Sequence, residues 1–540
     1  MKDTAGPTAG YVGGRPMPKQ RHFGERCDEL SRDDFMGQRK GPWPQPAPDS
    51  PVGMAAEVLH PPEDDLKLWK RRTQRYYIRE LVTKFPLALY NWFFQYRIDH
   101  LSDQEVAEMM TTSSYSKFLR KRTAAELRDT IFHERLAFAD DVGYLISDFT
   151  TMKRVKPKPG MYAAPTVSLF APKPGSKDYE CLAIAIGHQE GADWRYVVLM
   201  PGDEDAWMLA KYFVIQGASH MICLSGHPAS HFPYDTVNAV TVTALPKDHT
   251  LFRLLEPHLP LHLSVDHSVL QGRASIVSQS HRPIYSPFVG TNDNVRALVP
   301  TGYRGCDAPQ ELSRDPGCLQ RQNYRKWSYP KDGGQIPSDY GRVLRAYYAT
   351  VRRFVVKVVN HIATIADEGQ RGLELHFIRH WADYIEQWLP GFPDEDSVLV
   401  DGDAADRFPN LTTAVTTYIW AVAVAHSLEH ATFHRLGPHQ TSFRLRVPPP
   451  TSRQCKGYAR WQLVYGWDIF KATLAFEMFF KPHVIYPLAD VQYRFHEPAL
   501  AKAAAEFRAD LAATDQALAA EGVRVDRYIR HHQLSTSIQY

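Results

Sequence analysis

The sequence predicts a mainly α-helical protein: one large helical domain with a small inserted antiparallel β-sheet. Three observations favour this fold class. Apolar residues recur at helical spacing through long segments in both halves of the chain. Between residues 167 and 199 apolar and polar residues alternate instead, as they do in β-strands. The 540 residues are 44% hydrophobic and 12% aromatic, which is enough to bury a large core.

The first segment, residues 1–65, is rich in Gly, Pro and charged residues and includes GPWPQPAPDSP. It has no periodic apolar pattern, so we expect a flexible arm. The helical pattern begins near Leu66 and, apart from the strand-like stretch between residues 167 and 199, continues toward the C-terminus. We therefore expect a single domain over residues 66–540.

Residues 68–98 mix basic and aromatic side chains at helical spacing. The simplest interpretation is a helix whose apolar face packs inward. An alternative is that its Arg, Lys and Trp residues form a patch that contacts a membrane surface. Residues 101–110, LSDQEVAEMM, begin like a capped helix.

Three segments with a period of two, TVSLFAP, YECLAIAIGH and WRYVVLMP, predict the inserted sheet. Helical patterns dominate from Gly202 onward. The run from Leu411 to Ala425 is apolar but shorter than a membrane span, and we interpret it as a buried core helix. The later predicted helices cover residues 343–365, 373–389, 412–433, 458–480 and 498–522.

Charge and cysteine content narrow the class of protein. The net charge of +3 is too balanced to favour a nucleic-acid partner. The six cysteines form no CxxC pair and no disulfide-like spacing, which favours a reducing compartment. The N-terminus has no basic-then-apolar signal pattern, so a cytoplasmic location is expected.

Histidine pairs supply the candidate site. Five pairs stand four residues apart, more than random placement of 24 histidines would give. Four-residue spacing puts both imidazoles on one helix face, close enough to share a metal ion. His227 with His231 and His426 with His430 could close a nitrogen-rich site, which suits iron, manganese or zinc. For the pair at 376 and 380 we prefer the simpler role of hydrogen-bonded core residues.

Extended motifs surround these pairs. The segment DEDAWMLAKYFV precedes the first pair, TTYIWAVAVAHSLEHATFH contains the second, and the chain ends in LSTSIQY. In these features the sequence resembles the catalytic domain of the non-haem iron lipoxygenases over most of its length. Further residues that match the family pattern are His231, Leu245, Pro246, His249, Leu254, Leu255, Pro257, His258 and Gly272.

The resemblance implies a metal site. In the family, histidines and the C-terminal carboxylate bind iron. The matching residues here are His227, His231, His426, His430, which stands where the family usually has Asn, and the carboxylate of Tyr540, which replaces the usual Ile. Manganese would use the same ligands. The residues before position 66 leave no room for the lipid-binding β-sandwich that many members carry, so only the catalytic domain is expected.

The resemblance also implies an activity. Lipoxygenases add O2 to a polyunsaturated fatty acid or a related polyene and form a hydroperoxide. A metal-bound hydroxide, and no side chain, accepts the hydrogen. The partners implied are a polyunsaturated lipid and O2, and we expect a monomer that contacts membranes peripherally.

The first histidine pair departs from the family pattern, because three residues rather than four separate His227 from His231. Pro228 lies between them and Pro233 follows, so the helix must be kinked or restarted here. His220 is an alternative ligand on the same segment. Asp235 could orient a ligand imidazole or act as a solvated or capping carboxylate, and the sequence does not separate these roles.

Two other classes remain open. The segment HSLEH, residues 426–430, also fits the H-x-x-E-H motif of zinc peptidases, in which Glu429 would activate water. The chain could also be a lipoxygenase-fold protein that catalyses a different oxidation or has no dioxygenase activity.

Overall fold

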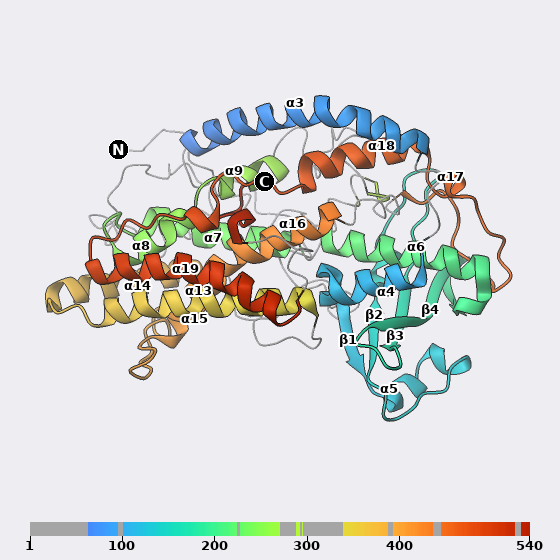
Figure 1. Ribbon diagram of the computed structural model, residues 1–540, viewed down its shortest axis with the longest axis horizontal. Helices are drawn as coiled ribbons and strands as arrows, with labels where there is room; N and C mark the ends of the chain where they lie inside the picture. The colour runs from blue at the N-terminus through green and yellow to red at the C-terminus, as the bar shows by residue number, and fades with distance from the viewer. Residues whose placement is uncertain are drawn as a thin grey trace.

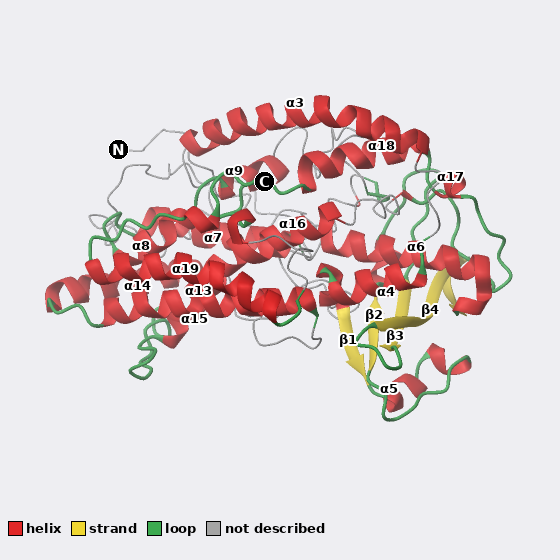
Figure 2. Ribbon diagram, in the orientation of Figure 1, coloured by secondary structure: helices red, strands yellow, loops and turns green. Residues whose placement is uncertain are grey.

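The structure is a computed structural model that describes residues 63–94, 101–223, 227–270, 288–291, 294, 338–386, 392–435, 444–523 and 531–540. Helices form most of it, and a small sheet lies at one end (Figure 2). The predicted fold class is confirmed. All but the last residues of the predicted N-terminal arm lie outside the described residues.

The sheet has five antiparallel strands in the order β1-β2-β3-β4-β5. The three predicted segments form β3, β4 and β5, while β1 and β2 were not predicted. Helices α4 and α6 pack on the sheet (Figure 1). The strands are β1 (Leu119–Arg122), β2 (Tyr144–Asp148), β3 (Thr166–Pro172), β4 (Tyr179–Glu190) and β5 (Asp193–Leu199).

The helical layer contains the predicted long helices. α13 packs against α15 and α19, and its inward stripe of apolar residues is buried (Figure 1). The predicted helix over residues 458–480 is broken between α17 and α18. The helices are α3 (Glu63–Phe94), α4 (Asp103–Thr112), α5 (Ala124–Arg128), α6 (Glu204–Met221), α7 (Pro228–Ala244), α8 (Thr250–Leu255), α9 (His262–Leu270), α13 (Asp339–Ala363), α14 (Glu368–Glu386), α15 (Pro409–Trp420), α16 (His426–Arg435), α17 (Arg460–Leu463), α18 (Gly466–Ala475) and α19 (Pro498–Ala520).

The capped start of α4 is confirmed. Ser102 is the N-cap, its hydroxyl accepts a hydrogen bond from the backbone N–H of Glu105, and the Glu105 carboxylate accepts one from the backbone N–H of Ser102. This reciprocal pair satisfies two backbone donors that the first turn of a helix otherwise leaves free. It fixes the residue at which α4 begins.

The segment from Pro409 to Thr432 is long and apolar enough to cross a membrane, the only such segment in the part of the chain that the structure describes. Of the most apolar 18-residue part of this segment, 94% is buried inside the protein. Tyr418 and Trp420 are fully buried. The interpretation as a core helix is confirmed. Phe433, in the same predicted helix, has a side chain outside the described set.

α3 lies along the outer edge of the molecule and contacts α18 (Figure 1). The prediction that its apolar face packs inward is only partly correct. Tyr76 and Ala88 are buried, but Ile78, Val82 and Phe93 are 64%, 68% and 59% exposed. α3 covers the core with one side and presents large apolar residues to solvent with the other.

Candidate metal centre

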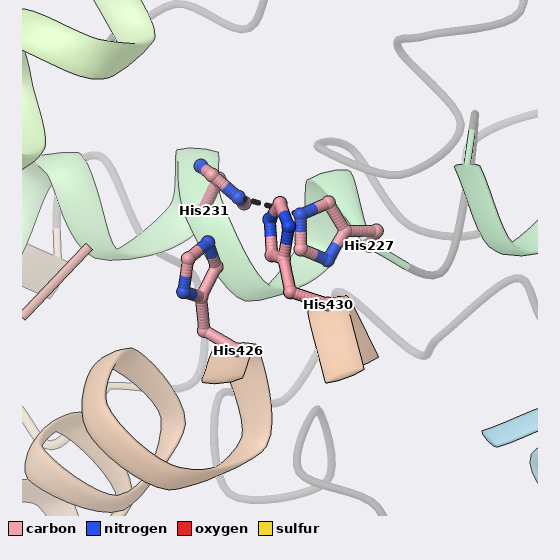
Figure 3. Close-up of side chains that lie close together, drawn as sticks. All are labelled: His227, His231, His426 and His430. Atoms are coloured by element: carbon pink, nitrogen blue, oxygen red, sulfur yellow. Dashed lines mark hydrogen bonds between the residues drawn. The ribbon is translucent and has the colours of Figure 1, made fainter. Parts of the chain in front are cut away.

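Two helices that are distant in sequence bring the histidines together. His227 and His231 come from the start of α7, and His426 and His430 come from the first turns of α16 (Figure 3). Ligand atoms of the four rings all lie within 4.8 Å of one another. All four residues are at most 8% exposed. The four predicted histidines therefore form one buried group.

The proline has the local effect that the sequence predicts. α6 ends at Met221, and α7 begins at Pro228 with His227 as its N-cap. Pro is well tolerated at this first helical position because its missing N–H would have no helical partner there. The restart brings His227 within ring contact of His231, with ring centroids 4.5 Å apart.

A π-helical turn, Ala421–Ala425, directly precedes His426. A π-type hydrogen bond also occurs just before the first histidine pair. The backbone N–H of His227 donates to the carbonyl of Ile222, five residues earlier, at 2.6 Å. The sequence predicts only an α-helical interval here, so these features were missed. π-type turns are common at functional sites because they re-aim the side chains that follow.

Carboxylates contact the Nδ1 atoms of two of the four rings. Nδ1 of His227 lies 2.7 Å from Oε2 of Glu429, and Nδ1 of His231 lies 2.8 Å from Oδ1 of Asp266. An ionised carboxylate only accepts hydrogen bonds, so each Nδ1 carries the proton and each Nε2 presents a lone pair. The sequence alone predicts neither of these carboxylates as a partner of the rings.

The remaining two rings also fit a ligand role. Nδ1 of His430 donates to the carbonyl oxygen of Phe480 at 3.1 Å, which leaves its Nε2 as the acceptor nitrogen. His426 is fully buried, and neither of its nitrogens has a hydrogen-bond partner among the described residues. A buried imidazole without a partner is costly unless an ion or another polar group meets it.

The group is neutral and rich in lone pairs. Burial and the neighbouring imidazoles hold the pKa values of His227, His426 and His430 well below the ordinary value. Nε2 of His227 lies 2.9 Å from Nε2 of His231 (Figure 3). Two lone pairs repel at this distance unless a cation lies between them. The residues present therefore fit a divalent or trivalent transition metal.

Glu429 does not fit the peptidase alternative. One of its oxygens contacts His227, and the other forms a buried ion pair with Lys117. A general base must have an oxygen free to take a proton from water. Glu429 instead orients a histidine ring.

The C-terminus reaches the same place. The ring of Tyr540 lies 5.2 Å from that of His426 and 4.8 Å from that of His430, measured between centroids. The tail is anchored on the way by Ser535, which hydrogen-bonds Ser427, and by Ser537, which donates to the carbonyl of Pro260. Burial raises the pKa of the Tyr540 phenol to about 12, so this group stays neutral.

Asp235 has neither of the two predicted roles. It is buried on α7 and contacts His262 rather than a ring of the histidine group or solvent. The carboxylate that orients His231 is Asp266, 35 residues further along the chain on α9.

His220 lies outside the group, so the prediction of an alternative ligand is wrong. It is buried in α6, edge-on to Phe288, and neither ring nitrogen has a hydrogen-bond partner among the described residues. Burial and the nearby charge of Lys158 lower its pKa to about 3.

This shift predicts a pH effect on stability. The unfolded chain protonates His220 near pH 6.5 and the folded chain only near pH 3, so falling pH favours unfolding across that window. At pH 5 the cost is about 2 kcal/mol. We expect the difference in free energy of unfolding between His220→Leu and the wild type to be about 2 kcal/mol more favourable to the variant at pH 5 than at pH 7. Urea unfolding at both pH values measures this difference. A gain that is the same at both pH values would contradict this account.

Together the fold and the site define a mainly helical protein with a buried group of four histidines on two core helices that could hold a metal ion. Several solved structures have a similar architecture. The manganese lipoxygenase of Gaeumannomyces graminis is 15% identical to the chain, with a TM-score of 0.64 over 88% of this chain and 91% of that one. A coral 8R-lipoxygenase is 16% identical, with a TM-score of 0.64 over 99% and 83%.

A fungal lipoxygenase from Fusarium graminearum is similar as well, at 14% identity and a TM-score of 0.57 over 83% of this chain and 80% of that one. The chain therefore has the lipoxygenase fold. No protein-family model and no curated protein matches the sequence.

Proposed function

We propose that the protein is a lipoxygenase-like dioxygenase that adds O2 to a polyunsaturated fatty acid or a related polyene and forms a hydroperoxide. The observation that carries this proposal is the buried group of four histidines on two core helices of a lipoxygenase fold. His227, His231, His426 and His430 would hold iron or manganese, with the carboxylate of Tyr540 as a fifth ligand. The metal would supply one-electron chemistry.

The protein's own residues set the conditions for that chemistry. Glu429 and Asp266 fix the tautomers of His227 and His231, so that Nε2 of each ring faces the metal position. Neutral imidazoles add no negative charge, which favours a high reduction potential. Burial keeps bulk water away from the reacting carbon of the substrate.

Oxygen uptake with linoleate tests the proposal. Protein reconstituted with iron, or separately with manganese, should consume O2 and form conjugated dienes. Metal-loaded protein that consumes no O2 with linoleate, arachidonate or a polyunsaturated phospholipid would contradict it and would favour a different oxidation on the same fold.

The exposed side of α3 supports a membrane contact during substrate capture. Ile78, Val82, Phe85 and Phe93 share one helix face by their spacing, and all are exposed. Toward the N-terminus the same face carries the exposed basic residues Lys67, Arg71 and Arg75. A stripe that is basic at one end and apolar at the other complements an anionic lipid surface.

Vesicle binding tests the membrane contact. Val82→Ser with Phe85→Ser should weaken binding to phosphatidylserine vesicles, because each large apolar residue adds about 1 kcal/mol or more on insertion. Oxygen uptake with dispersed linoleate should not change. Val400→Ser is a matched control, since Val400 is equally apolar and 48% exposed elsewhere. Binding equal to that of the wild type would exclude α3 as the contact.

A further inference from the structure

A second cluster of ligand-type side chains lies directly behind His231. Asp235 comes from α7, while His262 and Asp266 come from α9. All three are buried, with at most 1% of each residue exposed. Their ligand atoms lie within 4.8 Å of one another. The proposed function uses only one atom of this cluster, Oδ1 of Asp266.

The cluster buries two carboxylates without a fixed cation. Among the described residues no lysine or arginine forms an ion pair with Asp235 or Asp266, whose side chains contact His231, His262 and each other. Neither oxygen of Asp235 has a hydrogen-bond partner outside the cluster. Burying an uncompensated carboxylate costs several kcal/mol, so something must offset this charge.

The distances favour a metal ion over a simple ion pair. Nε2 of His262 lies 3.2 Å from Oδ1 of Asp235 and 3.2 Å from Oδ2 of Asp266. Charge-assisted hydrogen bonds are shorter, about 2.7–2.9 Å, and the Asp266–His231 contact in this protein is 2.8 Å. Ligands about 2.1 Å from one metal ion stand roughly 3.0–3.4 Å apart, which matches the cluster.

We propose that Asp235, His262 and Asp266 bind a second divalent transition-metal cation behind the four-histidine group. In the metal-free protein, Nε2 of His262 donates a hydrogen bond to the carbonyl oxygen of His231 at 3.3 Å. The ion would replace this proton and take the carbonyl as an additional oxygen ligand. One imidazole nitrogen with several oxygens suits zinc. The ion would tie α9 to α7. Asp266 also accepts a hydrogen bond from Nδ1 of His231. By holding Asp266 in place, the ion would therefore fix the orientation of the His231 ring.

A shared proton is the competing explanation for the close carboxylates. In the metal-free protein, burial and the charge of Asp266 raise the pKa of Asp235 well above its ordinary value. Asp235 would then hold a proton, which a cation must displace. Metal counting distinguishes the two cases.

The experiment uses the full-length protein, purified with its native metal, incubated with excess ZnCl2 and desalted. Iron, manganese and zinc are then counted per chain. We expect about two metal ions in the wild type and about one in Asp235→Asn or His262→Gln, which lose zinc but keep the first metal. Glu374→Gln removes another buried carboxylate, on α14, and should keep both ions.

His426→Ala separates this proposal from the proposed function, because it should lose the first metal and keep the second. A wild type with one metal ion, retained in Asp235→Asn and lost in His426→Ala, would overturn the second site and leave the first intact. Wild-type metal content in both Asp235→Asn and His262→Gln would overturn it as well. Far-UV circular dichroism checks that each variant is folded.

Discussion

His426→Ala is expected to reduce bound iron or manganese and oxygen uptake by on the order of 100-fold or more. His426 is fully buried, and its ring contacts those of His227, His231 and His430. Even residues that only orient metal ligands change affinity or activity by about 10–100-fold, so loss of a ligand should cost at least as much. Metal analysis and oxygen uptake on the same sample measure both effects.

His376→Ala is the matched control for this variant. His376 and His380 have the same four-residue spacing and a ring separation of 4.4 Å, but they lie on α14, outside the histidine group. This control should keep its metal and its activity. Full metal content in His426→Ala would contradict the assignment of His426 as a ligand.

Extending the chain by two residues beyond Tyr540 is expected to reduce turnover by on the order of 10-fold or more. The tail is held by Ser535 and Ser537, and the side chain of Gln539 accepts from the backbone N–H groups of Ile485 and Tyr486. The ring of Tyr540 lies beside those of His426 and His430, and two more residues would move the terminal carboxylate away from the end of this anchored tail. Oxygen uptake per bound metal ion measures the loss.

Tyr540→Phe keeps both the ring and the terminal carboxylate, so it should retain activity. This control separates the carboxylate from the phenol, which is neutral because burial raises its pKa to about 12. Unchanged turnover in the extended chain would exclude the carboxylate as a ligand.

Helical periodicity predicted most of the fold because each long helix buries a continuous stripe. The stripe from Leu344 to Ile362 lies within α13 as expected. Two strands escaped detection for a physical reason. β1 reads LRKR and has one buried residue, so its position is fixed by pairing with β2 rather than by its own apolar pattern.

The sequence also predicted which histidines meet, because local spacing and extended motifs both point to them. It could not predict what holds the rings. Asp266 and His231 are separated by 35 residues, and Glu429 and His227 by 202, so only the fold shows that they are partners. Because Asp235 lies four residues from His231, its spacing made it a candidate for orienting the His231 ring. In the structure α9 instead brings Asp266 against that ring.

The apolar pattern of α3 did not predict which side of this helix faces the core. Aromatic and aliphatic residues surround most of this helix, so the sequence does not show which of them face the core. Tyr76 packs inward, while Ile78 and Val82 face solvent. The cytoplasmic location, the monomeric state and the boundary of the domain at residue 66 stay predictions.

The most direct test of the metal centre is elemental analysis of the purified wild-type protein and of His426→Ala, with oxygen uptake on linoleate followed in the same samples. We predict about one iron or manganese ion per wild-type chain, accompanied by oxygen uptake, with both lost in the variant. Iron and manganese that together fall far below one per chain, or that persist in His426→Ala, would contradict the account.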